Sequence, residues 1–400
     1  MSDDAAIESR LAAPIREALQ GSTYGAWRRI ADADAVALAF GFPFPDSFPQ
    51  AELTDAVQTV FAEEGAQALQ YGGGTYADRL QDIVRERAAD RGIDAAPDEV
   101  TVTNGATHAI DSVCQAFLDP GDAIVVEAPT FMGALSVFRN YGVEIVPAPT
   151  DDDGLDVDAL ADLLATRREA GEAAPKLLYT IPNFQNPTGT TMPEGRRRRL
   201  LDLAAEYEMG VLEDDAYGAL RYDGEPDPPL RALDDDGRVI RVGTFSKTVA
   251  PGVRLGWVVA DPGVVEAVDT VAAGGTNTFT RSVVGRYCDA GGLDEALPEL
   301  RAAYRERRDR ILAALAEHMP ADATWTEPDG GFFVWVEAPG VDTTAMLDDA
   351  IDAGVTYLPG SMFYPDEGGD NHLRLSFSYE EPAAIERGVA RLAETVAARN

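Results

Sequence analysis

Short apolar runs alternate with segments of helical spacing through the middle of the chain. Residues 106–117 have helical spacing, and Leu200, Leu203, Ala204 and Tyr207 mark one face of another helix. Strands that are apolar throughout are buried on both faces, and helices supply the crossovers between parallel neighbours. The pattern therefore predicts an α/β fold with a mostly parallel central sheet covered by helices. The runs that we expect to form strands are residues 100–103, 123–127, 176–181, 210–213, 239–242 and 254–260.

The pattern changes past about residue 284, where we expect a smaller α+β domain. Residues 297–317, rich in arginine and acids, favour a long helix. Residues 35–40 are a further strand candidate near the N-terminus, followed by a passage rich in glycine and proline. The expected division is an N-terminal arm and part of the small domain at 1–48, a large domain at 49–284 and a C-terminal small domain at 285–400. The strand candidates of the C-terminal domain are residues 330–336, 354–358 and 372–378.

The charge of the chain excludes several classes of partner. The 400 residues include 69 acids against 33 bases, which gives a net charge of −36. Nucleic acids and anionic membrane surfaces both attract basic proteins, so neither is an expected partner. No apolar run reaches the roughly 18 residues that a membrane helix needs, and the N-terminus has acids where a signal peptide needs bases. We expect a cytoplasmic protein.

Only two of the basic residues are lysines, Lys176 and Lys247. A dense acidic surface with almost no lysine resembles a halophilic protein, in which salt screens the self-repulsion. A codon bias that replaces lysine by arginine is the alternative, and the two can coexist. The four arginines at 196–199 suggest either an anion site or a solvated helix face paired with acids, and the net charge favours the solvated face. The two cysteines, Cys114 and Cys288, are expected to be small buried apolar residues.

The strongest chemical signal surrounds Lys247. This lysine follows a strand end among hydroxyl side chains, seven positions before Arg254. A lysine in a shielded site can lose its proton and form a Schiff base with a carbonyl group. Hydroxyl groups and an arginine suit a phosphate. The combination indicates pyridoxal 5'-phosphate, and the alternative is a surface lysine beside a structural turn.

Four motifs, in order along the chain, resemble those of the fold-type I pyridoxal-phosphate aminotransferases of class I/II. They are Asn-Pro-Thr-Gly at 186–189, Asp-x-x-Tyr at 214–217, the lysine segment at 243–257 and an arginine strand at 372–378. Further matches extend the resemblance to residues 41–378, nearly the whole chain. The resemblance implies a homodimeric transaminase of amino acid metabolism that uses pyridoxal 5'-phosphate and has no metal site.

The resemblance also implies roles around the cofactor ring. Asp214 should face the ring nitrogen and hold its proton, which makes the ring an electron sink. Among three consecutive acids, Asp214 is chosen because it precedes Tyr217 by three positions, whereas Glu213 and Asp215 are expected to be strand-end acids of a very acidic protein. Tyr217 and Asn186 should donate hydrogen bonds to the phenolic oxygen of the ring.

The phosphate is expected at the start of the helix that follows residue 105. Backbone N–H groups there can cradle an anion. The family often has serine or threonine where Ala106 stands, so that contact is expected from the backbone alone. The predicted phosphate-binding residues are Gly105, Ala106, Thr107, Thr244, Ser246 and Arg254.

Phe131 matches the family aromatic that stacks on the ring face, and an ordinary core aromatic is an equal alternative. Tyr71 matches a tyrosine that reaches the phosphate of the other subunit, with loop residues near Thr276 and Asn277 as further candidates at that interface. Gly41 fits a glycine that lines the substrate pocket near the N-terminal arm.

Arg374 alternates with apolar neighbours in its strand and shares its face with small polar residues. A guanidinium group in such surroundings can grip a carboxylate through two hydrogen bonds, and the resemblance implies that it holds the substrate α-carboxylate. A clamped carboxylate leaves Cα–H as the bond to be cleaved, so deprotonation is expected rather than decarboxylation. Lys247 would then move the proton.

The substrate side chain is less clearly encoded. Phe42, Phe44 and residues 361–364 suggest apolar walls, whereas Arg28 or Arg29 could recognise an acidic side chain or could be surface arginines, the favoured interpretation. We expect an aromatic, branched-chain or aminoadipate type of donor, with 2-oxoglutarate as acceptor. Alternatives are a β-lyase or synthase on the same fold and, more remotely, an aminotransferase-like effector-binding regulator. The charge and the early positions of Gly41 and Tyr71 oppose the regulator.

Overall fold

The structure is a computed structural model that describes residues 10–12, 15–16, 29–272 and 274–399. Its largest sheet has eight strands in the order β2-β9-β8-β7-β6-β3-β4-β5. Neighbours from β8 to β4 are parallel, β9 runs antiparallel to both β8 and β2, and β5 forms a hairpin with β4. The strands are β2 (Val100–Thr103), β3 (Ala123–Ala128), β4 (Glu144–Asp151), β5 (Gly154–Leu155), β6 (Leu177–Thr180), β7 (Gly210–Asp214), β8 (Val239–Thr244) and β9 (Gly256–Val259).

The predicted mostly parallel sheet is confirmed, and each of the six runs expected in it forms a strand. The sequence pattern missed β4, which lies beside the short edge strand β5. Its side chains alternate between buried and exposed positions, and Pro147 and Pro149 interrupt it, so it contains no continuous apolar run.

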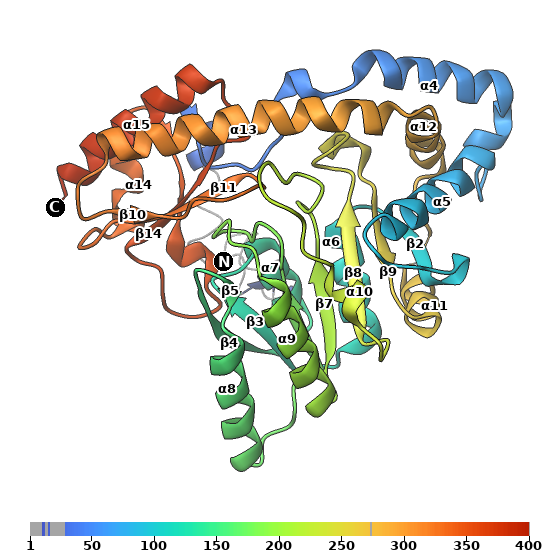
Figure 1. Ribbon diagram of the computed structural model, residues 1–400, viewed down its shortest axis with the longest axis horizontal. Coiled ribbons are helices and arrows are strands. Elements are labelled where there is room, and N and C mark those ends of the chain that lie inside the picture. The colour runs from blue at the N-terminus through green and yellow to red at the C-terminus, as the bar shows by residue number, and fades with distance from the viewer. Residues whose placement is uncertain (1–9, 13–14, 17–28, 273, 400) are drawn as a thin grey trace.

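Helices cover both faces of this sheet (Figure 1). One face is covered by α6 (Ala106–Phe117), α7 (Met132–Asn140) and α11 (Pro262–Val271). The other is covered by α8 (Val157–Glu169), α9 (Glu194–Glu206) and α10 (Leu230–Leu233). Consecutive strand residues such as Leu177 and Leu178 pack into opposite cores, as the two-residue repeat of a strand requires.

A second, antiparallel sheet has the order β10-β11-β14-β13, with bounds Thr324–Trp325, Phe333–Glu337, His372–Ser376 and Leu358–Pro359. The strand expected at 35–40 shortens to β1 (Val36–Ala37), which pairs in parallel with β12 (Val355–Thr356). The helices here are α13 (Gly292–His318), α14 (Thr343–Asp352) and α15 (Pro382–Ala397). The predicted long helix is α13, which runs across the molecule and packs on α15 (Figure 1).

Three further helices form a group at the other end of α13 (Figure 1). They are α4 (Gln50–Glu63), α5 (Thr75–Ala89) and α12 (Thr278–Asp289), and α12 packs against both of the others. Short 3-10 turns lie at Pro45–Ser47, Gly65–Leu69, Pro97–Glu99, Pro251–Val253 and Gly360–Phe363. Cys114 and Cys288 are buried free thiols, as predicted. No helix among the described residues is long and apolar enough to cross a membrane.

The arginine run at 196–199 does not form a uniformly solvated face, so that expectation is wrong for one residue. Arg197 is fully buried. Its guanidinium group donates to three backbone carbonyls and, at 2.7 Å, to the Oδ1 atom of Asn183. Arg196 and Arg198 pair with acids, as expected.

Candidate cofactor and substrate site

A cavity of about 410 Å³ lies where β7, β8 and the start of α6 face the smaller sheet. Ligands of open α/β sheets bind outside the carboxyl ends of the strands, which is where this cavity lies. Gly105 adjoins the cavity wall through Arg254. The predicted site residues that line the cavity together are Gly41, Ala106, Thr107, Phe131, Asn186, Asp214, Tyr217, Thr244, Ser246, Lys247, Arg254 and Arg374.

Asp214 ends β7 and is buried. Its Oδ2 atom accepts a hydrogen bond of 2.8 Å from the Tyr179 hydroxyl, whereas its Oδ1 atom has no partner among the described residues. Burial raises the pKa of Asp214 to about 6, against the lowering effect of the Tyr179 hydrogen bond. A buried carboxylate with one free oxygen is a suitable acceptor for a protonated ring nitrogen.

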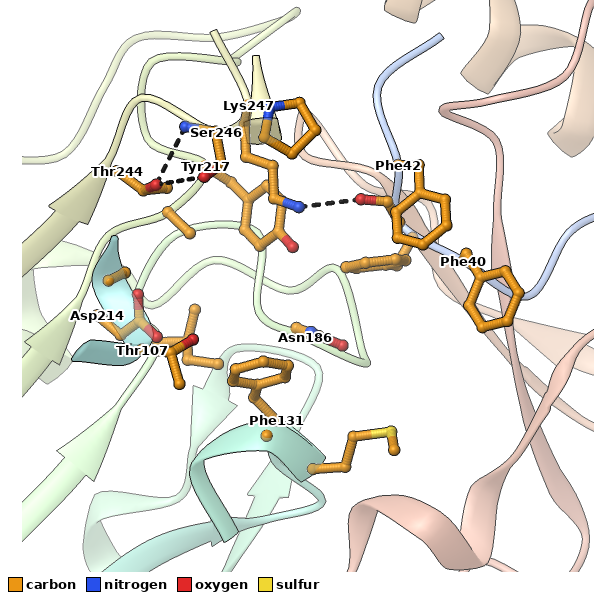
Figure 2. Close-up of a pocket in the computed structure, with 18 of the residues that line it drawn as sticks. Phe40, Phe42, Thr107, Phe131, Asn186, Asp214, Tyr217, Thr244, Ser246 and Lys247 are labelled. Atoms are coloured by element: carbon orange, nitrogen blue, oxygen red, sulfur yellow. Dashed lines mark hydrogen bonds between the residues drawn. The ribbon is translucent and has the colours of Figure 1, made fainter. Parts of the chain in front are cut away.

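Lys247 projects into the same cavity from the segment after β8 (Figure 2). Its Nζ atom donates to the Gly41 carbonyl at 2.9 Å. Desolvation, followed by the positive charge of Arg374, lowers the pKa of Lys247 to about 8. A substantial fraction of this amine is therefore neutral near physiological pH, which makes it a competent nucleophile.

The turn between β2 and α6 forms a cradle that requires glycine. Gly105 has a φ of +93°, and a Cβ atom there would lie 2.8 Å from Nη2 of Arg254. A Cβ atom on Gly256 would lie 2.6 Å from the backbone of Gly105. Beside this turn, the Thr244 hydroxyl group donates a hydrogen bond of 2.8 Å to the Ser246 hydroxyl oxygen (Figure 2). Backbone N–H groups at a helix start, two hydroxyl groups and an arginine are groups that suit a phosphate.

Arg374 is held in β14 and is only 4% exposed. Its Nη1 atom donates to Asn186 Oδ1 at 2.7 Å, and its Nη2 atom donates to the Ala39 carbonyl at 2.6 Å. The guanidinium carbon lies 3.9 Å from the centre of the Phe333 ring. No carboxylate of the described residues pairs with it, and burial lowers its pKa to about 9. A buried arginine without an acidic partner suits an anionic substrate group.

Phe131 precedes α7 and is half-buried, and its ring faces the cavity (Figure 2). A Cβ atom on Gly133 would lie 2.4 Å from that ring, so the glycine leaves room for it. The ring also packs against the core under α6 and α7, so both interpretations offered for Phe131 keep support.

Two predicted elements lie outside this cavity. Tyr71 is 94% exposed and lines a separate pocket together with residues 276–277. Arg29 forms a surface ion pair of 3.0 Å with Asp348, and Arg28 lies outside the described residues.

The acids on either side of Asp214 lie at the end of β7, as expected, but they do not belong to the acidic surface. Glu213 and Asp215 are both buried. Arg241 pairs with Asp215 and lies 3.6 Å from Glu213, and Asn183 donates to Asp215 at 2.8 Å. The signal that sequence reasoning missed is Arg241 itself, because a charge inside the apolar strand β8 requires a buried partner.

A further buried acid, Glu127, was also missed. It ends the apolar run of β3 and accepts a hydrogen bond of 3.0 Å from Gln185, in addition to two other donors. Gln185 donates as well to the Pro129 carbonyl at 2.8 Å. Burial raises the pKa of Glu127 to about 7. The pair thereby joins the loop that carries Phe131 to the loop that carries Asn186.

The side chains of the cavity fit pyridoxal 5'-phosphate. The free Oδ1 atom of Asp214 suits the ring nitrogen, and the lowered pKa of Lys247 suits covalent attachment. The glycine turn against Arg254 suits the phosphate. The fold and the site together define a pyridoxal-phosphate enzyme of fold type I.

Comparison with known proteins gives the family. The family model described as aminotransferase class I and II matches residues 42–392. The chain is 42% identical over 369 residues to aromatic-amino-acid aminotransferase 1 of Thermococcus litoralis. The aligned region covers 91% of this chain and 88% of that protein. The chain belongs to the class I and II aminotransferase family and is a pyridoxal-phosphate-dependent transaminase.

Two solved structures of aminotransferases have the same fold as this chain. The kynurenine aminotransferase of Pyrococcus horikoshii, in complex with PMP, gives a TM-score of 0.92 at 39% identity and covers 98% of both chains. The α-aminoadipate aminotransferase of Thermus thermophilus, complexed with N-(5'-phosphopyridoxyl)-L-leucine, gives 0.85 at 33% identity and covers 96% of this chain and 98% of that one. These findings favour transfer of an amino group between an amino acid and a 2-oxo acid over the lyase, synthase and regulator alternatives.

Proposed function

We propose that this transaminase takes aromatic or other large apolar L-amino acids as donors, with a 2-oxo acid such as 2-oxoglutarate as acceptor. The observation that carries the proposal is the composition of the cavity wall. Its cations, among the described residues, are Lys247, Arg254 and Arg374, and each has a role toward the cofactor or the α-carboxylate. The remaining wall is mostly apolar and includes Phe40, Phe42, Ile110, Met132, Phe333 and Leu358.

An aminoadipate donor is less well supported by this wall. A second carboxylate inside an apolar cavity needs a cationic partner. Arg29, one of the two arginines considered for this role, pairs with Asp348 at the surface and does not line the cavity. The printed names of the relatives from Thermococcus litoralis and Pyrococcus horikoshii, an aromatic-amino-acid and a kynurenine aminotransferase, point in the same direction.

In this proposal, the cavity residues hold the ring and the phosphate of the cofactor separately. Asp214 accepts from the protonated ring nitrogen, Asn186 and Tyr217 donate to the phenolic oxygen, and Phe131 covers one face of the ring. When bound, pyridoxal 5'-phosphate supplies an electrophilic carbonyl carbon and an electron-withdrawing ring. The phosphate is held by Gly105, Ala106, Thr107, Thr244, Ser246 and Arg254.

Two residues act on the amino acid. Arg374 binds the α-carboxylate, and its Nε atom has no hydrogen-bond partner among the described residues. Lys247 leaves the Gly41 carbonyl and moves a proton at Cα. Because the carboxylate is clamped, its bond to Cα is not the one aligned for cleavage, which favours removal of the Cα proton over decarboxylation.

We also propose a homodimer in which Tyr71 reaches the phosphate of the partner subunit. Tyr71 is almost fully exposed and lines a pocket together with Leu69, which is 64% exposed, and with Phe279. The Phe279 ring lies 5.5 Å from that of Phe61, which is 45% exposed, so apolar side chains gather at this surface. Sedimentation equilibrium tests the dimer, and Tyr71→Ala should weaken cofactor binding while Tyr379→Ala should not. A monomeric protein, or equal cofactor affinity in Tyr71→Ala, would refute this part.

The proposal also covers the acidic surface of the protein and the boundaries of its domains. A net charge of −36 supports a halophilic protein that works in a salt-rich cytoplasm, where ions screen its self-repulsion. We place the large domain at 49–284 and the small domain at 285–400 with part of 1–48, because β1 pairs with β12. Limited proteolysis should cut near residue 48, whereas the boundary at 284–285 lies within the buried part of α12 and should resist cleavage.

The substrate proposal is tested by the specificity constant for a panel of donors with 2-oxoglutarate. L-phenylalanine and L-kynurenine should exceed L-2-aminoadipate by about tenfold or more in kcat/KM, since a desolvated carboxylate without a partner costs at least about 1.4 kcal/mol. L-leucine should lie between them. A preference for L-2-aminoadipate would overturn the donor class and leave the transaminase activity intact.

A further inference from the structure

We propose that Tyr179 is a positioning residue for transamination, whose hydroxyl group fixes the Asp214 carboxylate so that one oxygen stays free for the cofactor. The inference rests on the role proposed above for Asp214. Tyr179 lies at the centre of the sheet, on β6, between Val126 of β3 and Leu212 of β7.

The hydroxyl group of Tyr179 has a fixed direction. Its side chain is fully buried, and its ring packs edge-on against Phe138 of α7, with ring centres 5.3 Å apart. The hydroxyl donates to Oδ2 of Asp214 at 2.8 Å. Because the ring is held by both the sheet and the helix, the donor remains aimed at one carboxylate oxygen.

The pairing of Asp214 is one-sided. Its Oδ2 atom has the Tyr179 donor, whereas the equally buried Oδ1 atom has no partner among the described residues. Buried polar atoms are seldom left without a partner, and such an atom in a cavity wall indicates a ligand atom. Tyr179 thus determines which oxygen remains for the ring nitrogen.

The same hydrogen bond favours the ionised carboxylate. Burial and the charge of Asp215 raise the pKa of Asp214, whereas the Tyr179 donor and the Lys247 charge lower it, and the result is about 6. The pKa of Tyr179 itself lies well above its ordinary value because of burial, so its hydroxyl stays protonated. The titratable groups that face the pair are Asp215, Glu127, Tyr217 and Lys247.

The test compares Tyr179→Phe with the matched control Tyr141→Phe. Tyr141 also donates to an aspartate, Asp111, at 2.9 Å, but it lies outside the cavity. We expect Tyr179→Phe to lower kcat about tenfold, because one hydrogen bond to a charged group is lost. The KM for the amino acid should change less than about twofold. The control should leave both constants unchanged.

A second readout needs no turnover. Equilibrium dialysis of pyridoxal 5'-phosphate against the apoprotein should show weaker binding in Tyr179→Phe, most strongly as the pH falls from about 8 to about 6. Loss of the donor raises the pKa of Asp214, so its carboxylate is protonated at a higher pH. A purely structural defect would weaken binding equally at each pH and would overturn the proposal.

The variant Asp214→Asn separates the possible failures. In that background, Tyr179→Phe should lower kcat no further, because both changes act on one group. If Asp214→Asn alone keeps the normal kcat, the role of Asp214 fails. If Asp214→Asn collapses kcat while Tyr179→Phe keeps it, or if the two effects multiply, only the positioning role of Tyr179 fails.

Discussion

Replacing Arg374 by alanine tests how the site recognises amino acids regardless of their side chain. The guanidinium group is buried and has no acidic partner among the described residues, so an incoming carboxylate can supply one. The change should therefore weaken every donor to a similar extent, from L-phenylalanine to L-leucine.

The magnitude follows from the two hydrogen bonds that a carboxylate can accept. Each charge-assisted bond contributes about 1.5 kcal/mol, so their loss costs about 3 kcal/mol, or about 100-fold in kcat/KM. Arg374 also lowers the pKa of Lys247, so its removal should raise that pKa above about 8. The rate of cofactor attachment should then need a higher pH to reach its plateau.

Steady-state kinetics with three donors of different side chains measures this effect. Arg374→Lys should recover only part of the lost kcat/KM, because a single ammonium cannot form the two parallel bonds of a guanidinium. Arg29→Ala, a surface ion-pair variant, is the control and should match the wild type. A loss in Arg374→Ala restricted to acidic donors would refute α-carboxylate recognition and make Arg374 a side-chain reader.

Three further predictions concern the remaining machinery and the core. Lys247→Ala should abolish borohydride-fixed attachment of the cofactor, whereas Lys176→Ala should keep it; a fixed cofactor in Lys247→Ala, mapped by peptide mass spectrometry, would contradict the assignment. Attachment to the wild-type apoprotein should quicken with pH and reach half its plateau rate near pH 8, since the neutral amine attacks; a pH-independent rate contradicts this. Arg197→Met should lower the free energy of unfolding in urea by about 3 kcal/mol, because it leaves buried acceptors unpaired; a change below about 0.5 kcal/mol would show a dispensable side chain.

Much of the central sheet could be predicted from the sequence because its strands are buried on both faces. A run such as residues 239–242 has no competing helical spacing, and six such runs became strands. The strand β4 was not predicted because one of its faces is solvated. The strand at Val36–Ala37 is short because, within the described part of the chain, its ladder extends over just the two residues of β12.

The buried polar residues were harder to predict, since burial of a charge depends on a partner distant in sequence. The burial of Glu213 and Asp215 could not be predicted, because their partner Arg241 lies on another strand. Arg197 carried a usable signal, because it shares a helix face with Leu200, one turn later.

The cavity residues with local motifs were brought together as the resemblance implied, whereas their supports were not foreseen. Tyr179 lies in a wholly buried strand, and nothing in its sequence neighbours shows that its hydroxyl group meets Asp214. Glu127 likewise ends an apolar run. Such contacts depend on which strands become neighbours in the sheet, and the order of the chain does not show that β3, β6 and β7 lie side by side.

The most direct measurement is the absorption spectrum of the purified protein with pyridoxal 5'-phosphate in concentrated potassium chloride, before and after L-phenylalanine is added. The visible band of the bound aldehyde form should give way to the near-ultraviolet band of the amine form, and 2-oxoglutarate should restore it. A protein that develops no bound-cofactor band after reconstitution, or a band that no amino acid converts, would contradict transamination at this site.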